Sequence, residues 1–173
     1  MNIRAQRDLM PLFLENLVNG NYLIPKFQRD FIWTSKQIVD LFDSIIKGFP
    51  IGSIIMWSPG EERFPVYGNI CGIDVNAESD SQCYILDGRQ RLSSLVSVLM
   101  KKAENSGSFY VDMNDLTVIK STKHNVGPEM LLLSDAYDSI SVVDYISRLR
   151  NDSTITIDFL QRGQGTIPVA YLA

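Results

Sequence analysis

Tyr84–Leu92 reads YILDGRQRL, and this stretch decides the fold. A short apolar run ends at Asp-Gly, and a leucine-rich pattern with helical spacing follows at once. This order predicts a strand over residues 83–86, a tight turn and a helix over residues 89–103. Backbone N–H groups at a helix start are unpaired and carry partial positive charge. Because two arginines stand beside them, the turn is a candidate phosphate site.

The composition is that of an ordinary globular protein. The chain has 173 residues, of which 45% are hydrophobic and 21% charged, so it can bury a core within one domain. No apolar run of the sequence approaches the roughly 20 residues that cross a bilayer, and the N-terminus lacks the pattern of a signal peptide. We therefore expect a cytoplasmic domain over residues 1–173 without membrane contact. The abrupt end at Leu172-Ala173 indicates the N-terminal part of a longer protein.

Charge and residue counts exclude several classes of function. Sixteen basic and twenty acidic residues give a net charge of −4, which argues against broad nonspecific binding of nucleic acid but allows a local basic pocket. The single histidine, His124, excludes HNH nucleases and most zinc hydrolases, and we expect it in a solvated loop. Cys71 and Cys83 lie outside any CxxC motif, so we expect reduced thiols, with a disulfide left open.

Two helices are predicted before the deciding stretch. Residues 8–19 form the first, with Asp8 as its N-cap. Its expected apolar stripe consists of Leu9, Leu12, Phe13 and Leu17. The second begins at Thr34, where Thr34 and Gln37 form a capping box, and it ends before Gly48.

The remaining pattern predicts strands and one more helix. Residues 58–82 read as a loop with one short strand. The other expected elements are a strand at 53–57, a hairpin of 109–113 with 116–119, a helix at 140–150, a strand at 154–159 and an extended segment at 167–171. Strands occur both in hairpins and between helices. The fold class is therefore α+β, with a small mixed sheet flanked by helices.

A second charged motif precedes the Thr34 helix. Ile24–Arg29 reads IPKFQR, and Gln28 and Arg29 place polar groups beside large aromatic residues. We expect Phe27, Phe31 and Trp33 to be core anchors, with base stacking as the alternative. If this loop folds next to residues 87–91, three arginines and two glutamines converge on one cleft. Forked guanidinium groups bind phosphate oxygens in pairs, and glutamine can orient an attacking water.

Each residue of the Asp87–Arg91 turn also has a structural interpretation. Asp87 either caps the helix in a capping box with Gln90, or serves a metal ion, a water or a nucleotide. Gly88 either fits the turn or allows a phosphate to approach the backbone. Arg89 and Arg91 either lie on the helix surface or bind phosphate.

Four motifs in order resemble the N-terminal domain of GmrSD-type restriction endonucleases, which has a ParB/sulfiredoxin-like fold. The family pattern runs IPxFQRxxxW, then an aromatic-Pro-Ile-Gly after a helix, then DGQQR. The matching residues here are Ile24–Arg29, Trp33, Phe49–Gly52 and Leu86–Leu92, and the similarity covers residues 8–103. One position departs from the pattern, because Arg89 stands where the family has its first glutamine.

The resemblance implies binding and Mg²⁺-dependent hydrolysis of a nucleoside triphosphate, in proteins that cut modified foreign DNA as a defence against phage. Larger members carry a C-terminal HNH-type nuclease domain, which a chain with one histidine cannot contain. We expect Asp87 to hold the metal ion and to act with Gln90 in catalysis. The expected phosphate-binding residues are Gln28, Arg29, Gly88, Arg89 and Arg91. If the missing glutamine positions water, hydrolysis is reduced while binding persists.

Two other interpretations remain open from the sequence. In the first, the chain is a DNA-binding module that grips phosphates or senses a modified site without turnover. In the second, it is a structural or protein-interaction domain whose arginines form salt bridges. The expected partners are a nucleoside triphosphate, DNA reached through a nuclease domain or partner protein, and a second copy of the chain in a homo-oligomer.

Overall fold

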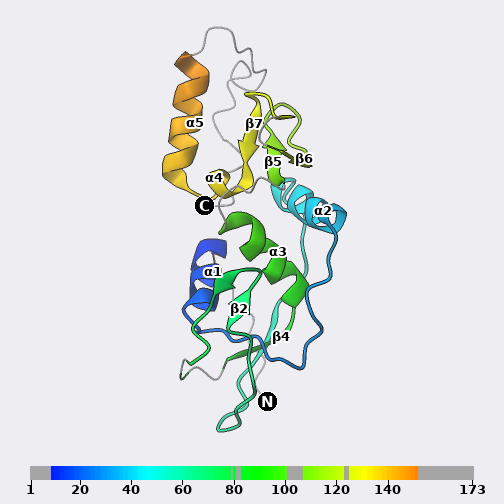
Figure 1. Ribbon diagram of the computed structural model, residues 1–173, viewed down its shortest axis with the longest axis vertical. Helices are drawn as coiled ribbons and strands as arrows, with labels where there is room; N and C mark the ends of the chain where they lie inside the picture. Colours follow the sequence, from blue (N-terminus) through cyan, green and yellow to red (C-terminus); the bar gives the residue numbers. More distant parts are fainter. Residues whose placement is uncertain (1–8, 79, 81–82, 101–106, 123–124, 152–173) are drawn as a thin grey trace.

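The computed structural model describes residues 9–78, 80, 83–100, 107–122 and 125–151. Helices and short strands alternate, which confirms the α+β class (Figure 1). The elements are α1 Met10–Val18, α2 Ser35–Ile46, β1 Ile55–Trp57, β2 Asn69–Ile70, β3 Ile73–Asp74, β4 Tyr84–Asp87, α3 Arg89–Leu99, β5 Ser108–Asp112, β6 Val118–Ser121, β7 Met130–Leu132, α4 Leu133–Ala136 and α5 Ser139–Asn151. The predictions for His124, residues 154–159 and residues 167–171 lie outside the described residues, and the prediction that Asp8 is the N-cap of the first helix was wrong, because Leu9 holds that position.

The strands form three small sheets and not the single mixed sheet that was expected. β1 pairs with β4, β2 with β3, and β5 with both β6 and β7, and every one of these pairs is antiparallel. Within the described residues, parallel pairing is limited to one bridge between Leu23 and Tyr84. The prediction failed because strands of two to five residues leave too few ladder positions to join into one sheet.

The lower region in Figure 1 consists of α1, β1–β4 and α3. The pairing around β4 brings three loops to one end of β4 in this region. Leu23 runs parallel to β4, with Ile85 N–H donating to Leu23 O at 2.8 Å. The loop that follows this segment and the turn that follows β4 therefore leave at the same end. β1 is antiparallel to β4, so the segment that precedes β1 arrives there too.

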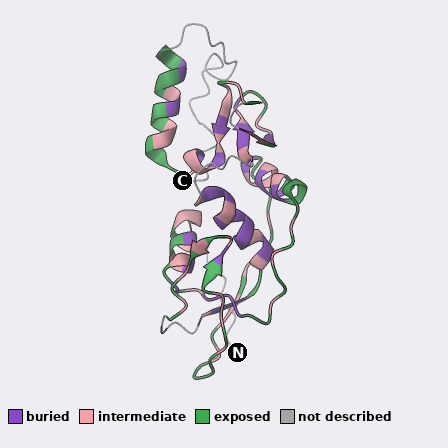
Figure 2. Cartoon of the chain, in the orientation of Figure 1, coloured by how far each residue is buried: buried purple, intermediate pink, exposed green. Residues whose placement is uncertain are grey.

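α3 is the most deeply buried helix of the lower region, and Figure 2 shows it at the centre of that region. The four residues that the spacing predicted on its inner face are all buried: Leu92, Leu95, Val96 and Leu99. α2 begins as predicted, because Thr34 Oγ1 accepts from Gln37 N–H and the Gln37 side chain accepts from Thr34 N–H. The hydrophobic core continues from this region into the one formed by β5–β7 and α5.

The apolar stripe predicted for α1 was partly wrong. Leu14 and Leu17 are buried and Phe13 is half-buried, whereas Leu9 and Leu12 are exposed. In a helix this short, the buried arc covers about two turns, and positions 13, 14 and 17 share it. Leu9 is the N-cap residue, so it lies outside the arc.

The predicted hairpin of residues 109–119 is confirmed as β5 and β6, and α5 corresponds to the predicted helix at 140–150. α2 packs against β6, where Asp43 Oδ1 accepts from Val118 N–H at 2.7 Å. Cys71 and Cys83 form no disulfide in the described structure, in keeping with the expected reduced thiols, and burial raises the pKa of Cys83. None of the helices described is long and apolar enough to cross a membrane.

Candidate functional site

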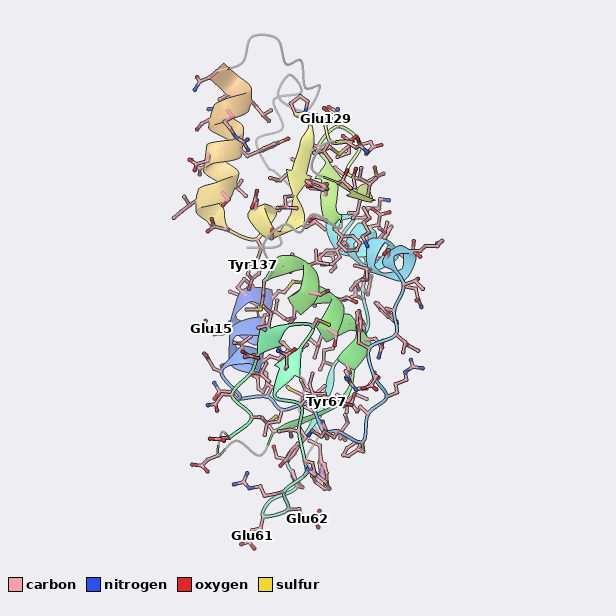
Figure 3. All side chains as sticks on the ribbon, viewed as in Figure 1. Glu15, Glu61, Glu62, Tyr67, Glu129 and Tyr137 are labelled. Atoms are coloured by element: carbon pink, nitrogen blue, oxygen red, sulfur yellow. The ribbon has the colours of Figure 1, made fainter. Side chains whose placement is uncertain are left out.

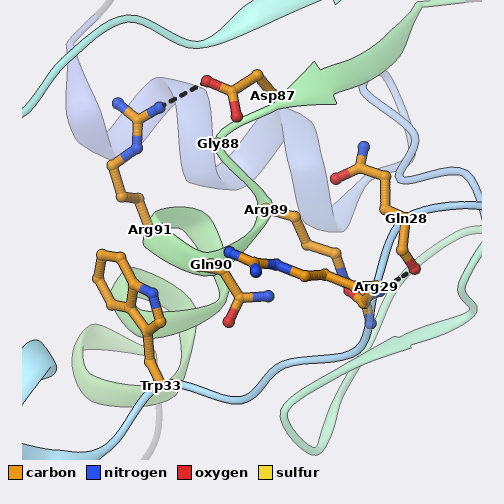
Figure 4. A pocket seen from close by; sticks show the side chains of 8 residues that line it. All are labelled: Gln28, Arg29, Trp33, Asp87, Gly88, Arg89, Gln90 and Arg91. Carbon is orange, nitrogen blue, oxygen red and sulfur yellow. Dashed lines mark hydrogen bonds and ion pairs between the residues drawn. The ribbon is translucent and has the colours of Figure 1, made fainter.

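The loop after Leu23–Pro25 and the turn after β4 line a pocket of about 290 Å³ at the N-terminal end of α3 (Figure 4). Its lining residues are Gln28, Arg29, Trp33, Asp87, Gly88, Arg89, Gln90 and Arg91. The structure thus brings together all seven residues that the sequence proposed for the site, and adds Trp33. The postulated meeting of the Ile24–Arg29 motif with the Asp87–Arg91 turn is confirmed as geometry.

Gly88 gives the turn its shape. It is the N-cap residue of α3 and has a φ of +104°, which side chains on L-residues rarely allow. A Cβ atom there would lie 2.3 Å from Ile54 Cδ1, so the segment before β1 packs directly on the glycine. Asp87 precedes the N-cap position and makes no capping bond, so the capping-box interpretation of Asp87 with Gln90 was wrong.

The backbone N–H groups of the first turn of α3 are not used by the helix itself. Leu92 N–H donates to Gly88 O at 2.9 Å, which is the first bond of the helical ladder. The N–H groups of Arg89, Gln90 and Arg91 precede it and have no partner among the residues described. They carry the positive end of the helix dipole at the pocket.

Arg29 is the arginine of the pocket whose guanidinium has no bonding partner among the described residues. Its side chain is exposed, and its guanidinium makes no ion pair or hydrogen bond within the described part of the chain. Figure 4 shows this side chain extending across the pocket toward the first turn of α3. Phosphate or carboxylate groups entering the pocket would meet it without displacing an internal partner.

Asp87 is the carboxylate of the pocket, and its side chain is 64% exposed. Oδ2 accepts from Arg91 Nη2 at 3.0 Å (Figure 4). Oδ1 has no partner among the described residues. Arg91 therefore fixes one oxygen and leaves the other available to a cation or a water.

Arg91 ties the segment before β1 to the start of α3. Its Nη1 donates to Ile51 O and its Nη2 donates to Ser53 O, each at 2.8 Å. With the bond to Asp87 this makes three interactions, and only 16% of the side chain is exposed. Gly52 makes room for the guanidinium, because a Cβ atom there would lie 2.6 Å from Arg91 Nη1.

Arg89 ties the loop after Leu23–Pro25 to α3. Nη1 donates to Gln28 O at 2.8 Å and also to Arg29 O, and Nη2 lies 3.4 Å from Asp30 Oδ1. The guanidinium stacks on Tyr67, 3.8 Å from the ring centroid. Tyr67, labelled in Figure 3, completes the arrangement by donating to Gln28 O at 3.2 Å. Glutamine at position 89 could not stack in this way.

Both glutamines also hold backbone. Gln90 is buried, its Oε1 accepts from Ile32 N–H at 3.0 Å, and its Nε2 donates to Asp30 O at 2.9 Å. Gln28 Nε2 donates to Ile85 O. The oxygen and the nitrogen of the Gln90 amide are thus both engaged in holding the loop. Its catalytic role stays a prediction.

The aromatic residues of the loop have three different environments. Phe31 is half-buried against the core, as expected. Phe27 is 62% exposed and meets Phe64 edge-on at 5.9 Å, so the expectation that it anchors the core was wrong. Trp33 packs against the core and also lines the pocket. The sequence signal for Trp33 was its place four residues after Arg29 in the family pattern, which does not reveal which way the ring faces.

The acidic residues nearby do not form a complete metal site. In the part of the chain that the structure describes, no group of three or more His, Cys, Asp and Glu side chains is placed to bind a metal ion. Asp87 alone offers a carboxylate in the pocket. This donor set fits Mg²⁺ brought with a phosphate ligand, since Mg²⁺ commonly takes one or two protein carboxylates together with phosphate oxygens and waters.

Fold and site together define an α+β domain with a polar pocket assembled from the Gln28–Trp33 loop and the Asp87–Arg91 turn. Residues 13–162 match the family described as "GmrSD restriction endonuclease, N-terminal domain". The match covers most of the chain, and the chain belongs to this family. An uncharacterized protein of Methanocaldococcus jannaschii, MJ0686, is 28% identical over 109 residues, which cover 56% of this chain and 19% of that protein. The chain thus spans about a fifth of the length of this relative.

Proposed function

We propose that the chain binds a nucleoside triphosphate as the regulatory domain of a DNA restriction system that defends against phage. The observation that carries the proposal is the uncommitted Arg29 guanidinium on the wall of a pocket into which the first turn of α3 opens. A cation and several backbone N–H groups around one cavity match the needs of a phosphate chain. The family membership supports the link to restriction.

The pocket residues divide into two groups by what they contact. Arg29, the α3 amides and the free oxygen of Asp87 face the cavity and would contact the ligand. Arg89, Arg91 and the two glutamines hold the loops in place. This division moves Arg89 and Arg91 from the phosphate-binding role expected from the sequence to a positioning role.

Asp87 would hold Mg²⁺ through the oxygen that does not accept from Arg91. When bound, Mg²⁺ neutralises charge on the phosphate oxygens and polarises the phosphoryl group that is attacked. Arg91 keeps the carboxylate turned toward the pocket through its bond to Oδ2. Gln90 serves the site by fixing the backbone on which Arg29 is carried.

We expect the chain to bind the nucleotide but to hydrolyse it only slowly. Orienting an attacking water needs a polar group that is free to accept or donate, as glutamine does in other nucleotide hydrolases. Here the amide of Gln90 is hydrogen-bonded to the backbone of Ile32 and Asp30. The first glutamine of the family's DGQQR motif is replaced by Arg89 in this chain. Binding needs neither amide.

The wider setting is part of the same proposal. The fold would be ParB/sulfiredoxin-like, and the chain would act in the cytoplasm as one domain, with a nuclease domain or partner protein that contacts DNA. Nucleotide occupancy of the pocket would then control cleavage by that nuclease. Self-association of the domain would be one route for this control.

Calorimetry with each of the four nucleoside triphosphates and Mg²⁺ tests the proposal. At least one nucleotide should bind, and Arg29→Ala should weaken binding about 10- to 150-fold, the range for losing hydrogen bonds of ~1.5–3 kcal/mol to a charged group. Arg150→Ala is the matched control, because Arg150 is exposed on α5 and does not line the pocket. Absence of binding for all four nucleotides to the unaltered chain would overturn the proposal.

Titration with duplex DNA separates the rival function. A DNA-binding module would bind DNA without nucleotide, with an affinity that falls steeply as salt rises. The proposal expects weak DNA binding by this chain alone, in keeping with its net charge of −4.

A further inference from the structure

We infer that Trp33 is the nucleobase-stacking surface of the pocket, so that the site selects nucleotides over inorganic polyphosphates. This inference rests on the proposed function and concerns the end of the nucleotide opposite its phosphates, the base. Trp33 is the one aromatic residue among the eight that line the pocket. The other seven present charged groups, amides or backbone.

The position of Trp33 is fixed on both sides along the chain. Ile32 N–H donates to Gln90 Oε1 at 3.0 Å, and Thr34 N–H donates to Gln37 Oε1 at 2.9 Å. The side chain is partly buried and packs against the core. A side chain held in this way loses little conformational entropy when a planar ligand stacks on it.

The indole N–H separates this residue from an ordinary core tryptophan. Buried tryptophans usually donate this group to a partner. In the described part of the chain the N–H of Trp33 has no hydrogen-bond partner, and it is not a buried unsatisfied group. It is therefore open to water or to a ligand, as expected for a ring that forms a pocket wall.

Charge and apolar surface lie on different walls of the pocket. Figure 4 shows Trp33 on the side of the first α3 turn away from Asp87, and the Arg29 side chain ending near Gln90 of that turn. A ligand with phosphates at one end and a planar aromatic ring at the other matches this division. Stacking of a base on an aromatic side chain contributes about 1–3 kcal/mol, or roughly 5- to 150-fold in affinity.

The first test compares the best-bound nucleoside triphosphate with inorganic tripolyphosphate. The unaltered chain should prefer the nucleotide by roughly 5- to 150-fold. Trp33→Leu should remove most of this preference and leave the affinity for tripolyphosphate within about 2-fold, and Trp33→Phe should keep part of it. Equal affinity of the unaltered chain for both ligands, or an equal loss for both in Trp33→Leu, would overturn the inference.

The second test uses fluorescence of Trp33. The chain has two tryptophans, and Trp57 lies on β1 against Phe64, outside the pocket lining. In a Trp57→Phe variant, the nucleotide should quench the emission of Trp33, whereas tripolyphosphate should not. Tight binding of the nucleotide without quenching would refute stacking while leaving the proposed function standing. Failure of both ligands to bind would instead remove the proposed function and the inference with it.

Discussion

Replacing Arg91 with alanine should destabilise the fold, whereas replacing Arg29 should not. Arg91 donates to two backbone carbonyls at 2.8 Å and to Asp87 at 3.0 Å. Hydrogen bonds from a charged group contribute about 1.5–3 kcal/mol each, but they are not additive and the carboxylate partner is exposed. We expect a loss of about 2–4 kcal/mol in the free energy of unfolding, or roughly 5–15 °C in Tm for a chain of this length.

Arg29 is the matched comparison because it has the same charge in the same pocket. Its guanidinium is exposed and has no partner among the described residues, so Arg29→Ala should change the free energy of unfolding by no more than about 0.5 kcal/mol. Thermal unfolding followed by circular dichroism measures both variants without ligand. An Arg91→Ala variant as stable as the unaltered chain, or an Arg29→Ala variant as unstable as Arg91→Ala, would refute the division between clamp and ligand-binding arginine.

Three further predictions use the same unfolding assay. Gly52→Ala should lose more stability than Gly60→Ala: both glycines have positive φ, but the added Cβ meets Arg91 at 2.6 Å in one case and nothing within 4 Å in the other. Equal losses would show that backbone strain alone matters. Arg89→Gln should lower Tm by roughly 4–12 °C, since a cation–π contact and two bonds to carbonyls are lost; an unchanged Tm would contradict the clamp. Burial raises the pKa of Asp135 in the folded state, so its ionisation opposes folding once the pH exceeds its unfolded pKa. Asp135→Asn should therefore raise Tm at pH 7, with the gain vanishing toward pH 3; a gain independent of pH would have another cause.

The parts of the fold that local chemistry dictates could be predicted from the sequence. The capping box at Thr34, the β5–β6 hairpin and the inner face of α3 depend on residues close together in the chain. The β2–β3 hairpin in residues 58–82 was foreseen as one short strand at most. Two-residue strands have no alternation to detect, so such pairing depends on the packing of the whole region.

The site was predictable as a place but not as a set of roles. Its residues converge because Leu23 and β4 run parallel, and the family pattern indicated that the motifs belong together. No sequence feature shows whether a guanidinium faces a carbonyl or a cavity. Arg29, Arg89 and Arg91 are alike in sequence context, and only their partners in the structure distinguish them.

The clamping bonds also explain why the motifs occur together. Arg91 needs Gly52 for room, and the bonds from Gln90 hold the backbone that leads from Arg29 to Trp33. Loss of one motif would therefore leave another without its support, even where neither contacts the ligand. Residues that only face the cavity are under no such constraint from the fold. Arg89, the position that departs from the family pattern, is itself one of these clamps, so the departure concerns support of the loop before it concerns chemistry.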